Sequence, residues 1–295
     1  MTTDPGTEPH GLSEPMIEAL ERLCIDVAVA AGRLIRDDRP RRVGVTATKS
    51  TDTDVVTVMD QRSEELLHRL IRSARPDDGV LGEEGVDVVG TSGLTWIVDP
   101  IDGTVNYLYD IPAYAVSVAV VTGDARTDGA WRPVAGAVAD PCRRVVHHAR
   151  RGGGAWSRPE PSDGTDHLQS GEVPRRLTVS SEERLGRALL ATGFGYDPEV
   201  RARQADVLRR VLPQVRDIRR IGSAALDLVR VAEGTVDAYA ESGINAWDLA
   251  AGWLIVEEAG GVVLGKGSHP GKVLTVAAGP GLVEPLRALF LPTGH

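Results

Sequence analysis

The most constraining feature of the sequence is an apolar run that ends in two carboxylates, Trp96-Ile97-Val98-Asp99-Pro100-Ile101-Asp102-Gly103-Thr104. Residues 94–98 have the composition of a buried strand, and a buried carboxylate is costly unless it is paired or binds a metal. Pro100 fixes one backbone dihedral angle and so limits how far the two acids diverge. Gly103 permits close approach of a backbone or ligand, and Thr104 can begin a helix whose free N–H groups attract anions. From this fragment alone, two interpretations remain possible. One is a turn in which Asp102 caps that helix, and the other is a metal site.

Other segments also place acids where apolar strands end or helices begin. Glu83 and Glu84 follow the short strand predicted for 79–82, Asp60 precedes a predicted helix, and Asp248 lies in the first turn of another. An Asp at a helix N-terminus is usually only a cap. Several such acids that can point into one cleft, with no Cys or His among them, favour a hard cation, above all Mg²⁺.

The hydrophobic periodicity predicts an α/β fold, in the broad sense that includes α+β. Amphipathic helices are predicted over 15–38 and 61–73. Strand-like segments with short connections predict a mostly antiparallel sheet, and they are 79–82, 94–98, 114–121, 134–139 and 144–149. The Pro-, Gly-, Ser- and Asp-rich segment 158–174 predicts a loop. It separates an N-terminal half, 13–157, which carries the metal site, from a C-terminal half, 175–295.

In the C-terminal half, strand and helix patterns alternate, which predicts an α/β layer. The strands are expected at 187–192, 216–221 and 236–241, and the helices at 199–212, 223–232 and 247–259. The arginine-rich stretch 202–220 is expected to be a solvated helix face or a subunit contact. His147 and His148 lie in an alternating strand, so one imidazole should face out and the other in. Residues 150–156 predict a turn, because they lack the Lys-Ser/Thr of a P-loop.

The composition limits the partners. The formal net charge of −9 argues against nucleic acid, because binding a nucleic-acid backbone requires a basic surface. Cys24 and Cys142 are too few for a zinc cluster or a disulfide framework, which favours a reducing cytoplasm. Residues 1–12 predict a flexible tail rather than a signal peptide. No stretch approaches the roughly 20 apolar residues of a membrane span, so a membrane partner is not expected.

Four blocks of sequence, in order, resemble the inositol monophosphatase family. They are K-S-x-x-x-D-x-V-T-x-x-D at 49–60, G-E-E at 82–84, W-I-V-D-P-I-D-G-T at 96–104 and W-D-x-A-A-G at 247–252, with G-S-A-A at 222–225 and E-S-G-I at 241–244 in addition. The resemblance spans roughly 15–290. It implies a layered αβαβα sandwich of the inositol monophosphatase and fructose-1,6-bisphosphatase type, with the active site between the two halves. It also implies Mg²⁺-dependent hydrolysis of a small phosphate monoester, lithium sensitivity and a homodimer.

The resemblance further implies a role for each matching residue. Glu83, Asp99 and the carbonyl of Ile101 would hold one Mg²⁺, and a second would lie between Asp99, Asp102 and Asp248. Glu83 would also help to hold a weaker third ion. The catalytic residues would be Asp60, Thr104 and Glu83, with Asp60 and Thr104 orienting and deprotonating the attacking water. The residues expected to contact substrate are Asp102, Gly103, Thr104, Gly222, Ser223, Ala224, Glu241 and Asp248. Lys49 would neutralise surplus carboxylate charge. Gly85 departs mildly from the family pattern, in which Ser or Thr is frequent.

Three alternatives remain open. A phosphatase that forms an aspartyl-phosphate uses Asp-x-Asp-Gly-Thr, but here two residues separate Asp99 from Asp102. A non-catalytic protein that has kept the fold would be expected to lose its metal ligands first. Among substrates, Glu241, seven residues before Asp248, favours a compact polyol such as myo-inositol 1-phosphate. Histidinol phosphate comes next, followed by fructose 1,6-bisphosphate and 3′-phosphoadenosine nucleotides.

Overall fold

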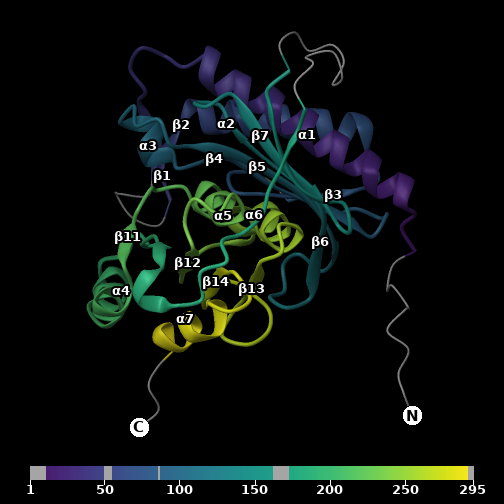
Figure 1. Cartoon of the computed structure of the whole chain (residues 1–295). Coiled ribbons are helices and arrows are strands. Elements are labelled where there is room, and N and C mark those ends of the chain that lie inside the picture. Colours follow the sequence, from purple (N-terminus) through teal and green to yellow (C-terminus); the bar gives the residue numbers. More distant parts are fainter. Residues whose placement is uncertain (1–10, 50–54, 86, 162–172, 292–295) are drawn as a thin grey trace, which may run out of the picture.

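The computed structural model describes residues 11–49, 55–85, 87–161 and 173–291. Most of the expected N-terminal tail and of the 158–174 loop lies outside these residues. The helices and strands form five layers (Figure 1). Helices α1 (Glu14–Asp37) and α2 (Val58–Ala74) cover the outer face of a first sheet, and α5 (Ala224–Ala232) and α6 (Ala246–Glu258) lie between that sheet and a second. Helices α4 (Pro198–Val211) and α7 (Val283–Phe290) form the last layer. The predicted layered α/β sandwich is therefore confirmed.

The first sheet has seven strands in the order β3-β4-β5-β6-β7-β8-β9, and only β3 and β4 run parallel. Its strands are β3 (Gly79–Gly82), β4 (Leu94–Asp102), β5 (Ala115–Gly123), β6 (Trp131–Asp140), β7 (Val145–Arg150), β8 (Gly154–Pro159) and β9 (Arg175–Arg176). Successive side chains of β5 alternate between two cores. Val116, Val118 and Val120 pack towards α1 and α2, whereas Ala115 and Ala119 face the middle helices. A sheet covered on both faces explains why its strands are apolar throughout.

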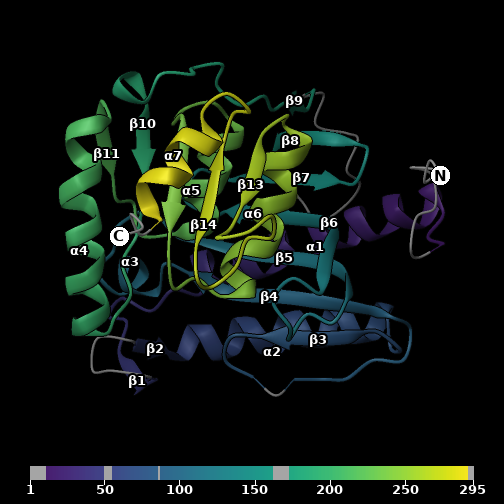
Figure 2. The same cartoon turned by 90° about the horizontal axis from the view of Figure 1, so that it is seen from below.

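The second sheet has five strands in the order β11-β10-β12-β14-β13 (Figure 2). They are β10 (Leu189–Ala191), β11 (Asp217–Arg219), β12 (Ala238–Glu241), β13 (Val262–Leu264) and β14 (Thr275–Ala278). Strand β10 runs parallel to both of its neighbours, and β14 runs antiparallel to both of its own. Helix α6 is buried continuously from Leu249 to Val256, because a helix between two sheets has no solvent-facing side.

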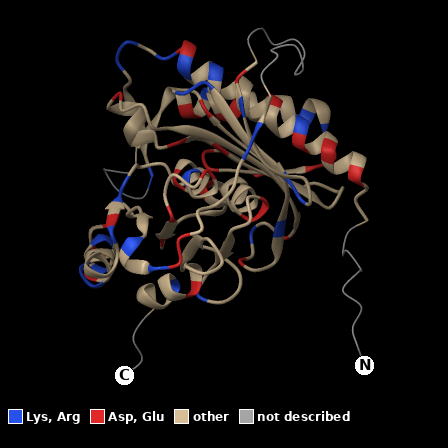
Figure 3. Cartoon of the chain, in the orientation of Figure 1, with Lys and Arg blue, Asp and Glu red and all other residues tan. Residues whose placement is uncertain are grey.

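The remaining elements are short. Strands β1 (Val45–Thr48) and β2 (Val55–Thr57) pair with each other, α3 (Thr104–Leu108) follows β4, and two 3₁₀ turns cover Leu185–Arg187 and Leu212–Gln214. Residues 151–153 form the β7–β8 turn, as expected. The arginines of α4, whose positions on the ribbon are blue in Figure 3, are all exposed, which agrees with a solvated helix face. No helix among the described residues is long and apolar enough to cross a membrane.

The expectation that one of the two adjacent histidines faces out is wrong. His147 and His148 do point to opposite faces of β7, but both side chains are buried. His148 Nδ1 lies 2.8 Å from Glu21 Oε1 of α1, and His147 lies on the side of Glu233, which caps the C-terminus of α5. The alternating pattern of a strand predicts which face of the sheet a side chain occupies, but it does not predict that helices cover both faces of that sheet.

Candidate active site

Three acids from distant parts of the chain converge on one point. Asp99 and Asp102 come from the end of β4 and Asp248 from the first turn of α6, and each offers a carboxylate oxygen within 4.8 Å of the others. Asp99 and Asp102 are 1% and 7% exposed. Three carboxylates packed this closely need positive charge between them, and an oxygen-only donor set suits a hard divalent cation. The residues present therefore fit a Mg²⁺ site.

The end of β4 is shaped to present both acids. The predicted strand 94–98 continues to Asp102, and its pairing with β5 is irregular between Asp99 and Asp102. Asp99 Oδ1 accepts a hydrogen bond from the Ile101 amide at 3.0 Å. The Ser63 hydroxyl of α2 donates to the Pro100 carbonyl at 3.0 Å. An irregular strand end of this kind can aim two side chains into one site.

Asp102 does not cap α3, which was one of the two possibilities that the sequence left open. Gly103 is the N-cap of α3, and the Asp102 carboxylate instead binds the N-terminus of α5. It accepts hydrogen bonds from Ser223 Oγ at 2.6 Å, from the Ala225 amide at 2.7 Å and from the Ala224 amide at 3.3 Å. A negative charge at a helix N-terminus is stabilised by the helix dipole. Asp102 therefore joins the first sheet to the middle helix layer.

Asp248 is fixed by its own helix. Its carboxylate accepts a hydrogen bond from the Asn245 amide at 2.6 Å, and together they form a capping box at the start of α6. This cap is the ordinary role of an Asp in a first turn, and here it also points the side chain at Asp99. The structural and the metal-binding interpretations of Asp248 are therefore compatible.

Burial dominates the electrostatics of the acidic cluster. It raises the pKa of Asp99 and Asp248 well above the ordinary range, and the charges of neighbouring acids raise both pKa values further. Burial also raises the pKa of Asp102, although the bonds from Ser223 and α5 offset part of that change. Without a cation, the folded protein therefore holds protons on this cluster that an unfolded chain would release.

Glu83 and Lys49 border the cluster as expected. Lys49 Nζ lies 2.8 Å from Glu83 Oε1 and also pairs with Glu84. Burial raises the pKa of Glu83 to about 7, with Lys49 opposing that shift. For Lys49, burial alone would lower the pKa, but the two glutamates raise it overall. Lys49 therefore carries the positive charge that partly neutralises these acids.

A buried acid of α2 explains the unusual Gly85. Glu64 Oε2 accepts a hydrogen bond from the Glu84 amide at 2.7 Å. A Cβ on Gly82 or Gly85 would collide with the Glu64 carboxylate. The chain that carries Glu83 therefore wraps tightly around Glu64, and a larger residue at position 85 would displace that carboxylate. Helical periodicity gives no signal for this role, because Glu64 has the pattern of an ordinary charged helix residue.

Asp60 and Thr104 form the expected pair. Thr104 Oγ1 lies 3.0 Å from Asp60 Oδ1 and 2.9 Å from the Ile101 carbonyl, so its single proton has two acceptors within reach. The other oxygen of Asp60 accepts from the Thr57 amide at 2.8 Å. Burial raises the pKa of Asp60, and the bonds from Thr57 and Thr104 oppose that change.

The expected substrate residues Gly103 and Gly222 lie against each other. Gly103 has φ of 96°, and a Cβ there would lie 3.0 Å from the Gly222 carbonyl oxygen. Asn106 Nδ2 donates to the Ala113 carbonyl at 2.7 Å and to the Ile221 carbonyl at 2.8 Å, which ties these two segments together. Ser223 is the N-cap of α5 and Ala224 its first residue. The sequence analysis did not identify Asn106.

These residues line one cavity of about 560 Å³ between the two halves of the chain. Among the predicted site residues, those that line it are Lys49, Glu83, Asp99, Ile101, Asp102, Gly103, Thr104, Gly222, Ser223, Ala224, Glu241 and Asp248. Asp60 is fully buried behind Thr104. The sequence analysis missed Arg220 and Asp227, which also line the cavity. Both lie in segments with an ordinary helix or strand pattern, so nothing in the sequence alone distinguishes them.

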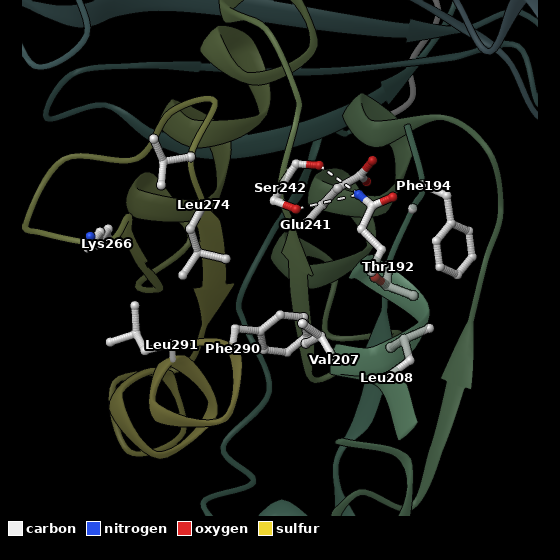
Figure 4. Close-up of a pocket in the computed structure, with 13 residues that line it drawn as sticks. Thr192, Phe194, Val207, Leu208, Glu241, Ser242, Lys266, Leu274, Phe290 and Leu291 are labelled. Carbon is white, nitrogen blue, oxygen red and sulfur yellow. Dashed lines mark hydrogen bonds between the residues drawn. The ribbon is translucent and has the colours of Figure 1, made fainter. Parts of the chain in front are cut away.

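Glu241, the last residue of β12, also lines this cavity. Burial raises its pKa to about 7, and the Tyr239 hydroxyl, which donates to Glu241 Oε2 at 2.8 Å, opposes the shift. A second cavity of about 240 Å³ shares Gly193, Phe194 and Glu241 with the first (Figure 4). It is lined mainly by apolar side chains such as Val207, Leu274 and Phe290, and Glu241 is the single acid in its lining.

The fold and the site together define a class, namely layered α/β sandwiches whose acidic cavity suits a divalent cation. A family model described as "Inositol monophosphatase family" matches residues 16–287. The chain belongs to the inositol monophosphatase family, whose members are metal-dependent phosphatases.

Relatives and solved structures agree with this assignment. The chain is 45% identical over 252 residues to "Inositol-1-monophosphatase SuhB" of Mycobacterium tuberculosis, covering 83% of this chain and 81% of the relative. It is 36% identical over 269 residues to "Nus factor SuhB" of Pasteurella multocida, covering 89% and 92%. The crystal structure of the extragenic suppressor protein suhB from Bartonella henselae has a TM-score of 0.78 at 33% identity and covers 92% of this chain and 98% of that one. Mycobacterium tuberculosis SuhB has a TM-score of 0.73 at 41% identity, with 92% and 95% covered.

The raised pKa values predict how the stability of the metal-free protein depends on pH. Glu83 and Glu241 titrate near 7 and Asp227 near 8 in the folded protein, all above their ordinary values. Between about pH 6 and about pH 8 these three groups hold protons that the unfolded chain would release, so their contribution to stability falls as pH rises through that window, whereas the lowered pKa of His147 acts in the opposite direction only at more acidic pH.

Thermal unfolding in a chelator should thus show a lower Tm at about pH 8 than at about pH 6. Mg²⁺ should raise the Tm more at the higher pH, where the carboxylates are ionised. A Tm in chelator that is flat or rises over this range would contradict the assignment of these buried acids.

Proposed function

We propose that the protein hydrolyses a phosphate monoester in a Mg²⁺-dependent reaction, and that the substrate is myo-inositol 1-phosphate. The observation that carries this proposal is the convergence of Asp99, Asp102 and Asp248 beside the Asp60–Thr104 pair. The first set can hold cations, and the second can hold a water molecule. Separately, each of these arrangements occurs for structural reasons, but together they supply what phosphate ester hydrolysis by direct attack of water requires.

Different residues of this chain would bind the metal and accept the proton of the attacking water. Asp99, Asp102 and Asp248, with Glu83 and the Ile101 carbonyl, would hold Mg²⁺, which when bound neutralises phosphate oxygens and lowers the pKa of water. Asp60 would accept the proton of the attacking water through Thr104, because Thr104 Oγ1 donates towards Asp60 at 3.0 Å. Ser223, the N-cap of α5, lines the same cavity, and the first amides of α5 hold Asp102 in place for the metal.

The part of the cavity around Glu241, where we place the alcohol of the substrate, supports a polyol substrate. Glu241 offers a carboxylate there and is itself held by the Tyr239 hydroxyl. Relatives at 45% identity carry the name inositol-1-monophosphatase, which also supports the inositol ester. Although the whole chain is only 4% aromatic, Phe194, Tyr196 and Trp247 line this cavity. These three aromatic residues keep a 3′-phosphoadenosine nucleotide among the substrates to be tested.

The deciding experiment compares kcat/KM for myo-inositol 1-phosphate, histidinol phosphate, fructose 1,6-bisphosphate and 3′-phosphoadenosine 5′-phosphate. Each is measured with Mg²⁺ and with a chelator. We expect hydrolysis only with Mg²⁺ and the highest kcat/KM for the inositol ester. A higher value for another ester reassigns the substrate and leaves the reaction intact, whereas full activity in chelator refutes the reaction itself. Incorporation of one solvent oxygen into phosphate, with Asp99 unlabelled, excludes an aspartyl-phosphate intermediate.

Glu241→Ala should raise KM for inositol 1-phosphate by about tenfold, because one buried hydrogen bond to a charged group is lost. An aryl phosphate has no hydroxyl group to place at Glu241, so its KM should change by less than about twofold. Steady-state kinetics on both substrates checks this. Equal losses on the two substrates would show that Glu241 supports the cavity rather than the alcohol.

We further propose two to three Mg²⁺ ions for each site, inhibition by lithium, a homodimer and a location in the cytoplasm. The charge balance supports more than one cation, because the three clustered carboxylates are accompanied by Glu83. Metal analysis of the dialysed protein, inhibition kinetics with lithium, light scattering and localisation in cells test these four points separately.

A further inference from the structure

Asp227 is a buried acid of the cavity that the proposed reaction does not use. It lies in the first turn of α5, its residue is 1% exposed, and it lines the same cavity as the metal cluster. Among the described residues, none donates a hydrogen bond to its Oδ1 atom. A buried acceptor without a partner is costly, and native structures keep few of them. Because Asp227 lines the cavity, a rotation of its carboxyl group about the Cβ–Cγ bond would present this oxygen to a ligand that supplies the missing donor.

Asp227 is not a member of the acidic cluster that would hold the metal. The carboxylates that come within 4.8 Å of one another are those of Asp99, Asp102 and Asp248, and Asp227 is not one of them. The nearby charges that act on it are those of Arg230, Glu241, Asp102 and Arg220. Of these, Glu241, Arg220 and the metal ligand Asp102 line the cavity with it. Asp227 therefore lies close enough to Glu241, the residue proposed to bind the substrate alcohol, for the charges of the two acids to act on each other, with Asp102 also nearby.

We propose that Asp227 is a specificity-determining residue that hydrogen-bonds a hydroxyl group of the substrate alcohol, beside the hydroxyl group held by Glu241. This inference rests on the proposed function and narrows its substrate class to phosphate monoesters whose alcohol carries at least two hydroxyl groups. The two carboxyl groups come from different elements, α5 and β12. They therefore select an alcohol that has both hydroxyl groups at the matching spacing. An unsubstituted aryl ester can satisfy neither of them.

The test compares Asp227→Ala and Asp227→Asn with the unaltered protein on inositol 1-phosphate, fructose 1,6-bisphosphate and 4-nitrophenyl phosphate. We expect Asp227→Ala to raise KM for the inositol ester by about tenfold, with kcat nearly unchanged, and to change KM for the aryl ester by less than about twofold. Asp227→Asn keeps a carbonyl acceptor and should recover part of the loss.

Asp140→Asn is the matched control. Asp140 is likewise buried, accepts a hydrogen bond from the Arg143 amide at 3.0 Å and lies outside the residues that line the cavity. Its replacement should leave the kinetics on every substrate unchanged. The Tm of each variant, measured in parallel, shows whether the cavity is still folded.

The outcomes separate this inference from the proposed function. If the unaltered protein prefers polyol esters and Asp227→Ala keeps that preference, the function stands and the role of Asp227 is refuted. Equal losses on polyol and aryl esters also refute that role, because they indicate general support of the site. If the unaltered protein shows no preference for either polyol ester, the proposed substrate class and the role of Asp227 fail together.

Discussion

Asp99→Asn should abolish Mg²⁺-dependent turnover, with a loss in kcat/KM of at least about a thousandfold, or ~4 kcal/mol in the barrier. Asp99 is 1% exposed and is central to the cluster, because the charges of Glu83, Asp102 and Asp248 all act on it. An amide has the same shape but contributes no charge, so the cation would lose its most enclosed ligand. The hydrogen bond from the Ile101 amide to position 99 can be kept by the amide oxygen, so the fold should persist.

The measurement is turnover as a function of Mg²⁺ concentration, together with direct Mn²⁺ binding by calorimetry. Asp140→Asn makes the same chemical change at a buried acid elsewhere in the first sheet and should leave both readouts unchanged. Wild-type Mn²⁺ affinity in Asp99→Asn would rule out this residue as a metal ligand, and lost binding with an unchanged Tm would support it.

Thr104→Ala should lower kcat by about a hundredfold to a thousandfold while leaving KM nearly unchanged. Its hydroxyl lies between Asp60 and the Ile101 carbonyl, at 3.0 and 2.9 Å, and so can carry the influence of the buried acid to a water in the cavity. Alanine leaves Asp60 buried with no connection to the substrate. Thr104→Ser keeps the hydroxyl and should retain most of the activity.

Steady-state kinetics on one substrate, with Mg²⁺ saturating, measures both variants. A Thr104→Ala protein with unchanged kcat would mean that Asp60 does not act through this hydroxyl. A loss confined to KM would instead place Thr104 among the phosphate contacts. A Thr104→Ser protein as poor as the alanine variant would point to a packing role for the Thr104 methyl group.

The sequence predicts a helix or strand well where the residues of that element alone determine its structure. Both ends of α1 and the whole of β3 follow from hydrophobic periodicity and local punctuation, whereas α2 begins at Val58, three residues before the predicted start, so that Asp60 lies in its first turn. The acids of the site are also visible in the sequence, because Asp99, Asp102 and Glu83 interrupt or end apolar strands. A carboxylate in such a position is costly unless a cation or a hydrogen-bond donor accompanies it, so the apolar pattern around it already indicates a site.

The sequence does not predict contacts that depend on another layer. Asp102 binds Ser223, which lies 121 residues later, so a local pattern could only suggest the nearer helix α3. Gly85 looks like a mild departure until Glu64 is seen to fill the space where its side chain would be. Asp227 carries no signal at all, because an acid in the first turn of a helix is common. In each case the missing information is which surface of one element meets which surface of another.

The contact between Asp102 and α5 has a consequence for synthesis of the chain on the ribosome. Asp99 and Asp102 emerge early, whereas Ser223, Ala225 and Asp248 emerge well over a hundred residues later. Until then the two early acids lack both the helix end and the third carboxylate that complete their surroundings. A nascent or truncated polypeptide that stops before α5 therefore lacks the complete centre.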